Sequence, residues 1–237
     1  MTSATDAAAR RSALVMLLAV NSGFIDAFGY VSLGGAFTSV MTGNMVLLGV
    51  SAGTANGTLA GHAATAIATF ILGCVIGTRI AGIPQPSDSV WPPAVSRALM
   101  VQMGLDVVLA VGWWSSHDHP SAHLSLALLA VNATALGLQS SAVQRFGVPG
   151  LSTTYLTGTL TQLVIKLTGH RSTRGAGLSL GLLGGLITGA VLGALVATHV
   201  PAVVPLVPLL LSGGVLLIAP RDAVGTMPNE VSQFSSA

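Results

Sequence analysis

Two short stretches, Met41-Thr42-Gly43-Asn44 and Leu156-Thr157-Gly158-Thr159, occupy matching places in the two halves of this 237-residue chain. They lie in apolar segments at residues 37–52 and 150–167, which are short for a membrane crossing of about 20 residues. The Thr-Gly pair in each segment favours an interrupted helix, because glycine permits a break and a threonine hydroxyl can replace lost backbone hydrogen bonds. We therefore expect two short re-entrant or broken helices that face one another near the middle of a membrane.

The composition is that of a membrane protein. Hydrophobic residues make up 51% of the chain, charged residues only 7%, and the mean hydropathy is +0.79. A soluble domain carries about 25% charged residues. The net charge of +2 and the lack of a basic tract argue against a nucleic-acid partner. Cys74 is the only cysteine, which excludes an internal disulfide and a cysteine metal site.

Six apolar segments are long enough to cross a bilayer. They cover residues 13–34, 61–81, 95–115, 123–143, 176–198 and 202–219. We divide the chain into a cytoplasmic tail, a first membrane repeat, an outer loop, a second membrane repeat and a disordered cytoplasmic tail. Their bounds are 1–12, 13–115, 116–122, 123–219 and 220–237.

Small residues recur at every fourth position after each Thr-Gly stretch. The first row is Gly61, Thr65, Thr69, Gly73, Gly77 and Ala81, and the second is Gly177, Gly181, Gly185, Gly189, Gly193 and Ala197. Such rows let helix backbones approach closely in lipid. We assign helix packing to Gly73, Gly77, Gly185, Gly189 and Gly193. The rows would serve equally to join the two halves or to form a homo-oligomer.

Two topologies compete. Eight crossings would give two parallel halves, whereas six crossings with two re-entrant segments would give inverted halves. With six crossings and a cytoplasmic N-terminus, every positive residue is cytoplasmic, as the positive-inside rule requires. These residues are Arg10, Arg11, Arg79, Arg97, Arg145, Lys166, Arg171, Arg174 and Arg221. We therefore predict an all-α polytopic membrane protein with two inverted three-span repeats, each containing one short re-entrant or broken helix.

Further residues carry a resemblance to a known family. In the first half they are Ser22 to Tyr30, Phe37, Met41 to Asn44 and Leu47-Leu48-Gly49, and in the second Leu136 to Gln139, Thr153-Thr154 and Thr157 to Thr161. Over roughly residues 13–220 the chain resembles the YoaK-like family of six-span bacterial membrane proteins, which share a domain of unknown function. The resemblance implies an integral protein of the bacterial cytoplasmic (inner) membrane, and it brings no established activity.

Asp26 is the strongest candidate for chemistry. It lies inside the first span, where an unpaired charge costs about 2.5 to 3.5 kcal/mol on insertion scales. It could bind a cation or carry a coupling proton, or it could instead hold the broken helix by hydrogen bonds. Ser22 and Tyr30, one helical turn to either side, are expected as its partners. Asp106, in the middle of the third span, is a second candidate for proton coupling.

Buried amides form a second group of candidates. Asn21 and Asn132 occupy matching places in the two halves, and Gln139 shares a helix face with Asn132. Such amides join helices more often than they bind a ligand, although they would suit a small polar solute. Asn44 has Thr159 as its counterpart, which makes the two sides of the expected site different.

Neither a metal site nor a catalytic motif emerges. His117, His119 and His123 lie in a short loop that also contains Pro120, and a solvated loop is the favoured interpretation. No G-x-S-x-G, H-E-x-x-H or P-loop pattern is present, so we do not expect an enzyme, a cofactor or a metal.

The sequence as a whole favours a small-solute transporter or channel with N- and C-termini in the cytoplasm. The expected solute- or ion-binding residues are Asn21, Asp26, Thr42, Gly43, Asn44, Asn132, Gln139, Thr157, Gly158 and Thr159. The expected partners are the lipid bilayer and a small solute. The alternative is a membrane protein that transports nothing and acts as a structural partner or a sensor.

Overall fold

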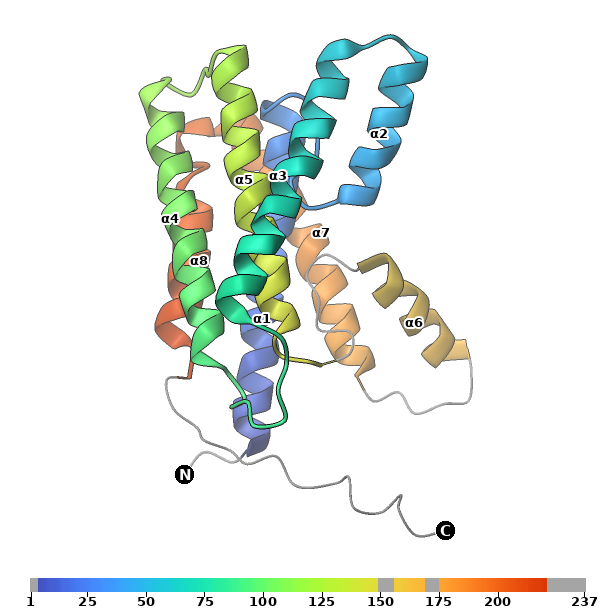
Figure 1. The fold of residues 1–237 in the computed structure, drawn as a ribbon, viewed down its shortest axis with the longest axis vertical. Helices are drawn as coiled ribbons and strands as arrows, with labels where there is room; N and C mark the ends of the chain where they lie inside the picture. Colours follow the sequence, from blue (N-terminus) through green and yellow to red (C-terminus); the bar gives the residue numbers. More distant parts are fainter. Residues whose placement is uncertain (1–3, 149–155, 169–174, 221–237) are drawn as a thin grey trace.

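The computed structural model describes residues 4–148, 156–168 and 175–220, and within these ranges the regular structure is entirely helical (Figure 1). The helices are α1 (Ala4–Ser32), α2 (Met41–Gly53), α3 (Gly57–Ala81), α4 (Pro93–Ser115), α5 (Ala122–Gln144), α6 (Leu156–Thr168), α7 (Ala176–His199), the 3-10 helix η1 (Pro201–Val203) and α8 (Leu206–Ile218). Six segments among the described residues are long and apolar enough to cross a membrane. The prediction of an all-α polytopic membrane protein is confirmed.

The sixth of these segments, Pro201–Ile218, joins η1 to α8. The remaining helices, α2 and α6, are too short to cross. Each has 13 residues, which corresponds to about 20 Å against a hydrocarbon layer of about 30 Å. They begin at Met41 and Leu156, within the segments 37–52 and 150–167 that the sequence marked as short. Residues 150–155 of the second segment lie outside the described residues.

The first helix begins earlier than predicted from the sequence. α1 starts at Ala4, whereas the first span was placed at 13–34 and residues 1–12 were taken as a tail. The added turns are rich in alanine and carry Asp6 in the first turn, and both features favour a helix start. The tail at 220–237 lies outside the described residues from position 221 onward.

Two pairs of helices make the closest contacts in the bundle, α1 with α7 and α3 with α5. In the first pair, a Cβ at Gly189 would lie 2.0 Å from the carbonyl oxygen of Val20, and a Cβ at Gly23 would lie 2.0 Å from that of Leu186. In the second pair, Gly73 and Gly137 are crowded in the same way, by Thr134 and Phe70. Each pair joins a helix from one half of the chain to a helix from the other, which is compatible with an inverted repeat.

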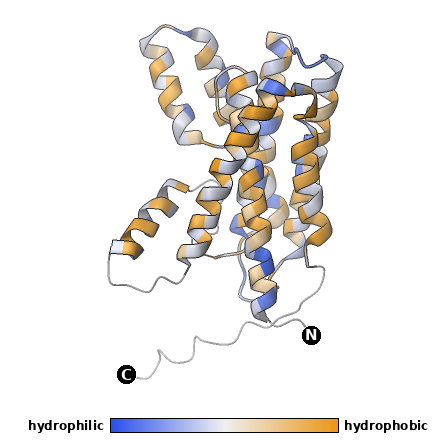
Figure 2. Cartoon of the chain, turned by 180° about the vertical axis from the view of Figure 1, so that it is seen from behind, coloured by the Kyte–Doolittle hydropathy of each residue, from blue (hydrophilic) through white to orange (hydrophobic). Residues whose placement is uncertain are grey.

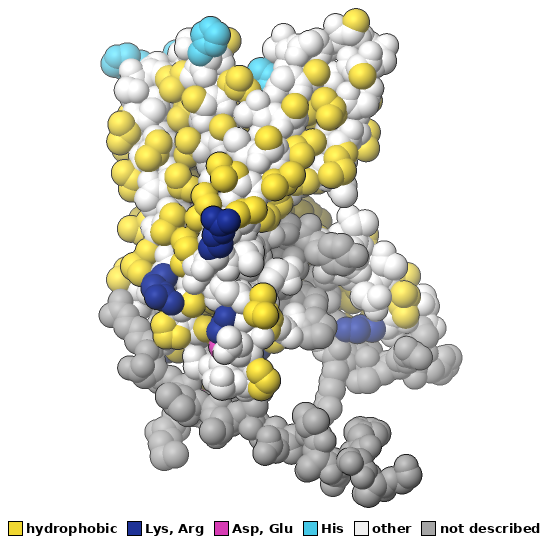
Figure 3. Space-filling model, in the orientation of Figure 1, with side chains coloured by type: hydrophobic (Ala, Val, Ile, Leu, Met, Phe, Trp, Pro, Cys, Tyr) yellow, Lys and Arg dark blue, Asp and Glu magenta, His cyan; other side chains and the backbone are white. Residues whose placement is uncertain are grey.

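Hydrophobic residues run along the helices of the bundle (Figure 2). Large exposed side chains that suit a lipid surface include Ile71, Leu72, Val108, Val111, Ile187, Val191, Leu195, Leu210 and Leu217. On the face shown in Figure 3, Lys and Arg side chains lie in the lower half and His side chains at the opposite end. Trp113 and Trp114, near that opposite end, donate their indole N–H groups to the carbonyl oxygens of Pro201 and Ala202.

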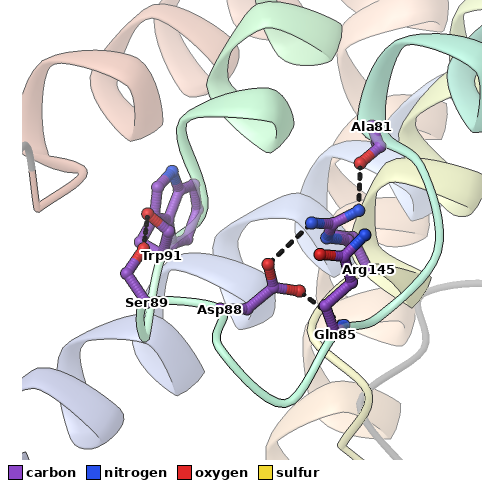
Figure 4. A network of polar contacts seen from close by, with 6 residues as sticks. All are labelled: Ala81, Gln85, Asp88, Ser89, Trp91 and Arg145. Carbon is purple, nitrogen blue, oxygen red and sulfur yellow. Dashed lines mark hydrogen bonds and ion pairs between the residues drawn. The ribbon is translucent and has the colours of Figure 1, made fainter. Parts of the chain in front are cut away.

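An ion pair ties the α3–α4 loop to the end of α5 (Figure 4). The Arg145 guanidinium lies 2.6 Å from Asp88 Oδ1 and also donates to the carbonyl oxygen of Ala81 at 3.0 Å. The backbone N–H of Gln85 donates to the other oxygen of Asp88 at 2.8 Å. Desolvation raises the pKa of Asp88, but the hydrogen bonds from Arg145 and Gln85 and the charge of Arg145 outweigh it, so this pKa lies below its ordinary value.

Asp88→Asn is expected to lower the free energy of unfolding by about 1 kcal/mol at neutral pH, because it removes the ion pair. Because folding lowers the pKa of Asp88, its stabilising contribution is complete above the ordinary value of 3.8 and is lost as the pH falls through the lower folded pKa. The difference between wild type and variant should therefore shrink in acid. Thermal unfolding of both proteins across this pH range measures it. Asp118→Asn, in the loop after α4, is the control, and a pH-independent difference for Asp88→Asn would contradict the assignment.

Candidate functional site

The chain between α1 and α2, which we call the linker (residues 33–40), turns back into the bundle. Gly34 and Gly35 have φ values of 106° and 80°, which residues with a side chain rarely adopt. Further along, Thr38 packs over Gly29 of α1, where a Cβ would lie 2.9 Å from the Thr38 methyl carbon. These glycines let the linker run against α1, so that α2 starts inside the molecule rather than at its outer end.

Asp26 of α1 holds the linker in this position. Its Oδ1 accepts from the Thr38 N–H at 2.7 Å, the Thr38 hydroxyl at 2.9 Å and the Ser39 N–H at 2.6 Å. Its Oδ2 accepts from the Ser39 hydroxyl at 2.5 Å. The partners proposed from the sequence, Ser22 and Tyr30, are wrong. Ser22 bonds to Leu18 and Gln139 instead, and Tyr30 stacks on Phe37 with ring centroids 5.0 Å apart.

Asn44 fixes the other side of the linker. Its Oδ1 accepts from the Phe37 N–H at 2.9 Å, and its Nδ2 donates to the Phe37 carbonyl oxygen at 2.7 Å. Asn44 is fully buried, and both the oxygen and the nitrogen of its amide bond to the backbone of Phe37. The residue before α2, Val40, provides no side-chain cap. Among the described residues, the backbone N–H groups of Thr42 and Gly43 therefore have no acceptor.

The two Thr-Gly stretches meet at one cavity of about 230 Å³, which we call the central cavity. It is lined by Ser39, Val40, Met41, Thr42, Phe70, Leu156, Thr157 and Leu186. The first residues of α2 and α6, two helices far apart in the sequence, thus face the same space. Figure 1 shows how α2 extends upward and α6 downward from this level of the molecule.

A second cavity of about 860 Å³ adjoins the central cavity at Thr42 and Thr157, and we call it the α6–α7 cavity. Its further lining residues are Gly158, Thr159, Thr161, Gln162, Lys166, Gly175, Leu178 and Ser179. It follows α6 from its first turn to Lys166 in its last, which lies toward the end of the bundle that carries the Lys and Arg side chains (Figure 3). Together the cavities reach from the middle of the molecule to that end.

Other candidates form a buried polar network away from the cavities. Gln139 of α5 donates to the Ser22 hydroxyl at 2.9 Å and accepts from Gln102 of α4 at 3.0 Å. Gln102 also donates to Ser212 of α8 at 3.3 Å, and Ser212 donates to Asp106 at 2.9 Å. The network joins α1, α4, α5 and α8 through polar side chains. Gln139 and Asp106 line neither of the two cavities.

Three further predicted residues, Asn21, Asn132 and Gly43, line neither cavity. Asn21 and Asn132 are fully buried, and their side-chain amides have no hydrogen-bond partner in the described part of the chain. Gly43 lies against the Phe37 ring. Thr38 and Ser39 were not predicted from the sequence, although their position directly before the helix start at Met41 was an available signal. Within the described ranges, no three His, Cys, Asp or Glu side chains come together as metal ligands would.

Comparison with known proteins agrees with this architecture. A family model described as a protein of unknown function, DUF1275, matches residues 14–218. The chain belongs to this family. It is also 35% identical over 164 residues to the UPF0700 transmembrane protein YoaK of Bacillus subtilis (strain 168), which covers 69% of this chain and 70% of the relative. No solved structure gives a significant match.

The DUF1275 match extends over both short helices and five of the six segments of spanning length, and it covers the first segment from residue 14 onward. The earlier resemblance to YoaK-like proteins is therefore confirmed, as is a multi-pass membrane protein. The family description assigns no activity, so the interpretation of the cavities depends on their geometry in this DUF1275 member.

Proposed function

We propose that the protein is a small-solute transporter or channel of the bacterial cytoplasmic membrane, and not an enzyme. The observation that carries the proposal is that Thr42 and Thr157, from the two halves of the chain, line one cavity at the first turns of two short helices. Broken helices at membrane depth are tolerated where they line a cavity, and in transporters their ends meet the solute near the midplane.

The proposed orientation places both termini in the cytoplasm. Arg10 and Arg11 lie near the start of α1, Arg79 lies in the last turn of α3, Arg97 lies near the start of α4, and Arg145 directly follows α5. In an up-and-down bundle these positions share one end, and the positive-inside rule assigns that end to the cytoplasm. The α6–α7 cavity would then open toward the cytoplasm, and the linker with the α2–α3 hairpin would cover the central cavity from outside.

In this proposal the role of Asp26 is to position the linker. Its four hydrogen bonds hold the linker, and the linker places the start of α2 at the central cavity. Direct solute binding by Asp26, and proton coupling by Asp26 or Asp106, stay predictions. Thr42, Thr157 and Gly158, which line the cavities, are the residues that we propose contact the solute.

Filling the cavity should stop transport. Thr157→Trp places an indole where a small side chain now borders both cavities, so we expect at least a tenfold loss of flux, on the order expected when a binding site is blocked. Purified protein in liposomes would be tested by stopped-flow light scattering after an osmotic step. The solutes are glycerol, urea, potassium formate and potassium nitrate, with valinomycin to prevent charge build-up.

The matched control is Thr168→Trp, at an exposed position in the last turn of the same helix and outside both cavities. This variant should retain the wild-type flux. If none of the solutes enters faster than into protein-free liposomes, the proposal fails in favour of the alternative, a membrane protein without transport activity. That alternative predicts a stable partner that remains bound on purification.

A further inference from the structure

The buried polar network between α1, α4, α5 and α8 lacks a hydrogen-bond donor at its α4 end. Gln102 and Asp106 lie one helical turn apart on α4, and both are fully buried. Both bond to the hydroxyl of Ser212 on α8, to which Gln102 Nε2 donates at 3.3 Å and from which Asp106 Oδ2 accepts at 2.9 Å. Their other oxygens, Gln102 Oε1 and Asp106 Oδ1, are buried and have no hydrogen-bond partner among the described residues. Buried oxygens without a donor are rare in proteins, so this pair requires an explanation.

The orientation of the two glutamine amides follows from one backbone carbonyl. Gln139 Nε2 lies 3.3 Å from the carbonyl oxygen of Leu18, which can only accept a hydrogen bond, so the nitrogen of this amide must face it. Oε1 of Gln139 then faces Gln102, and it accepts from Gln102 Nε2 at 3.0 Å. Turning over either amide, or both, would place two acceptor oxygens against each other. The unpaired atom of Gln102 is therefore its oxygen.

The hydrogen bonds of this network use all of its donors. Besides the two glutamines and Asp106, the network contains the hydroxyls of Ser22 and Ser212. Both N–H groups of each glutamine amide and the hydrogen of each hydroxyl are donated within the network or to the Leu18 carbonyl oxygen. No donor is left for the two unpaired oxygens, which belong to successive turns of α4.

No positive side chain in the described part of the chain neutralises Asp106. The helices packed against α4 are α3, α5 and α8, and α8 contains no titratable residue. Arg97 of α4 itself lies nine residues away, about 13 Å along the helix. None of the titratable residues of these helices bonds to Asp106, and they are His62, Cys74, Arg79, Arg97 and His123. An ionised carboxylate at this depth, with a single hydrogen bond and no cation, would be costly.

We infer that Asp106 is a proton-binding site, in which Oδ1 carries a proton and donates it to Gln102 Oε1 one helical turn away. One proton completes the network, because it turns one unpaired acceptor into a donor and leaves the other as its acceptor. Mg²⁺ and Ca²⁺ take at least six oxygen ligands, whereas the described residues of the network leave two oxygens free. The proton removes the charge of the carboxyl and completes the contact between α4 and α8. This inference does not depend on the proposed transport function.

Infrared spectroscopy tests for the proton directly. The full chain would be measured at neutral pH in dodecyl maltoside, a detergent without a carbonyl group, and the spectrum of Asp106→Asn would be subtracted. We expect the difference to contain the C=O stretching band of one carboxylic acid. The matched control is Asp118→Asn in the loop after α4, which should remove carboxylate bands instead, because an aspartate in contact with water is ionised at neutral pH.

Two further variants test the acceptor of the proton. Gln102→Leu should shift the acid band to higher frequency, because the proton loses its acceptor, whereas Gln85→Leu at an exposed loop position should leave the band unchanged. Asp106→Asn should melt close to the wild-type temperature, since the amide Nδ2 can donate where the proton did, and Asp106→Leu should melt lower.

The same spectra contain the outcomes that would overturn the inference. Loss of carboxylate bands in a folded Asp106→Asn protein would show that Asp106 is ionised, and a water molecule or a cation would then have to pair its oxygens. An acid band that does not move in Gln102→Leu would remove Gln102 as the acceptor. If Asp106→Asn does not fold, the response of the acid band to Gln102→Leu decides, because that variant retains the carboxyl group. None of these results bears on solute flux, so the proposed function stands or fails separately.

Discussion

Gly189→Leu is expected to abolish the folded bundle. Even the Cβ of an alanine at this position would lie 2.0 Å from the carbonyl oxygen of Val20 and 3.0 Å from the backbone nitrogen of Phe24. Both contacts are backbone atoms in the middle of α1, so neither can rotate away. Separating α1 from α7 would break the contact that joins the two halves. We expect a loss of more than about 3 kcal/mol, beyond ordinary overpacking.

The matched control is Gly184→Leu in the same helix, where an added Cβ meets no atom within 4 Å. Both variants remove a glycine from α7 and add the same side chain, so helix propensity and expression effects cancel. Size-exclusion chromatography in detergent and thermal unfolding would compare them, with Gly189→Ala as an intermediate step. A monodisperse Gly189→Leu protein with the melting temperature of Gly184→Leu would contradict the tight crossing of α1 and α7.

The glycine rows predict some of the close helix contacts but not all of them. Gly73 and Gly189 lie at close crossings, but Gly61 and Gly177, from the same two rows, meet no atom within 4 Å. The reason is geometric, because each step of four residues turns about 40° beyond a full helical turn. A long row therefore leaves the interface at its ends. Gly23 and Gly137, the crossing partners, belong to no row and were missed.

One part of the site could be predicted from the sequence repeat, and the other part depends on hydrogen bonds of the linker that no repeat indicates. The two Thr-Gly stretches repeat in sequence, and this repetition was enough to predict that Thr42 and Thr157 face one space. The linker has no repeat and no periodicity, so the bonds of Asp26 to Thr38 and Ser39 could not be read from spacing along a helix. A search along one helix face considers neighbours three or four residues away, whereas these partners lie 12 and 13 residues away.

Asp26→Ala is expected to abolish flux, whereas Asp26→Asn should retain at least about half of it, since the side-chain amide can make the same number of hydrogen bonds. In the asparagine variant, Oδ1 keeps its three donors, and Nδ2 donates to a Ser39 hydroxyl that turns to accept. Alanine leaves the buried N–H groups of Thr38 and Ser39 without an acceptor, at about 1 to 3 kcal/mol for each unsatisfied group. The linker would then leave α1, and the start of α2 would leave the central cavity.

Comparing the two variants distinguishes a role of Asp26 in positioning the linker from a role of its negative charge. Flux in liposomes would be measured beside the reactivity of a cysteine at Thr42, which reports whether the start of α2 still lines the cavity. A positioning role alone predicts normal Thr42 reactivity and at least about half of the wild-type flux for Asp26→Asn, and loss of both for Asp26→Ala. If Asp26→Asn keeps the Thr42 reactivity but loses flux, the carboxylate itself takes part in transport. The direct binding or proton-coupling role predicted from the sequence would then replace the positioning role, because the asparagine variant still holds the linker but lacks the negative charge.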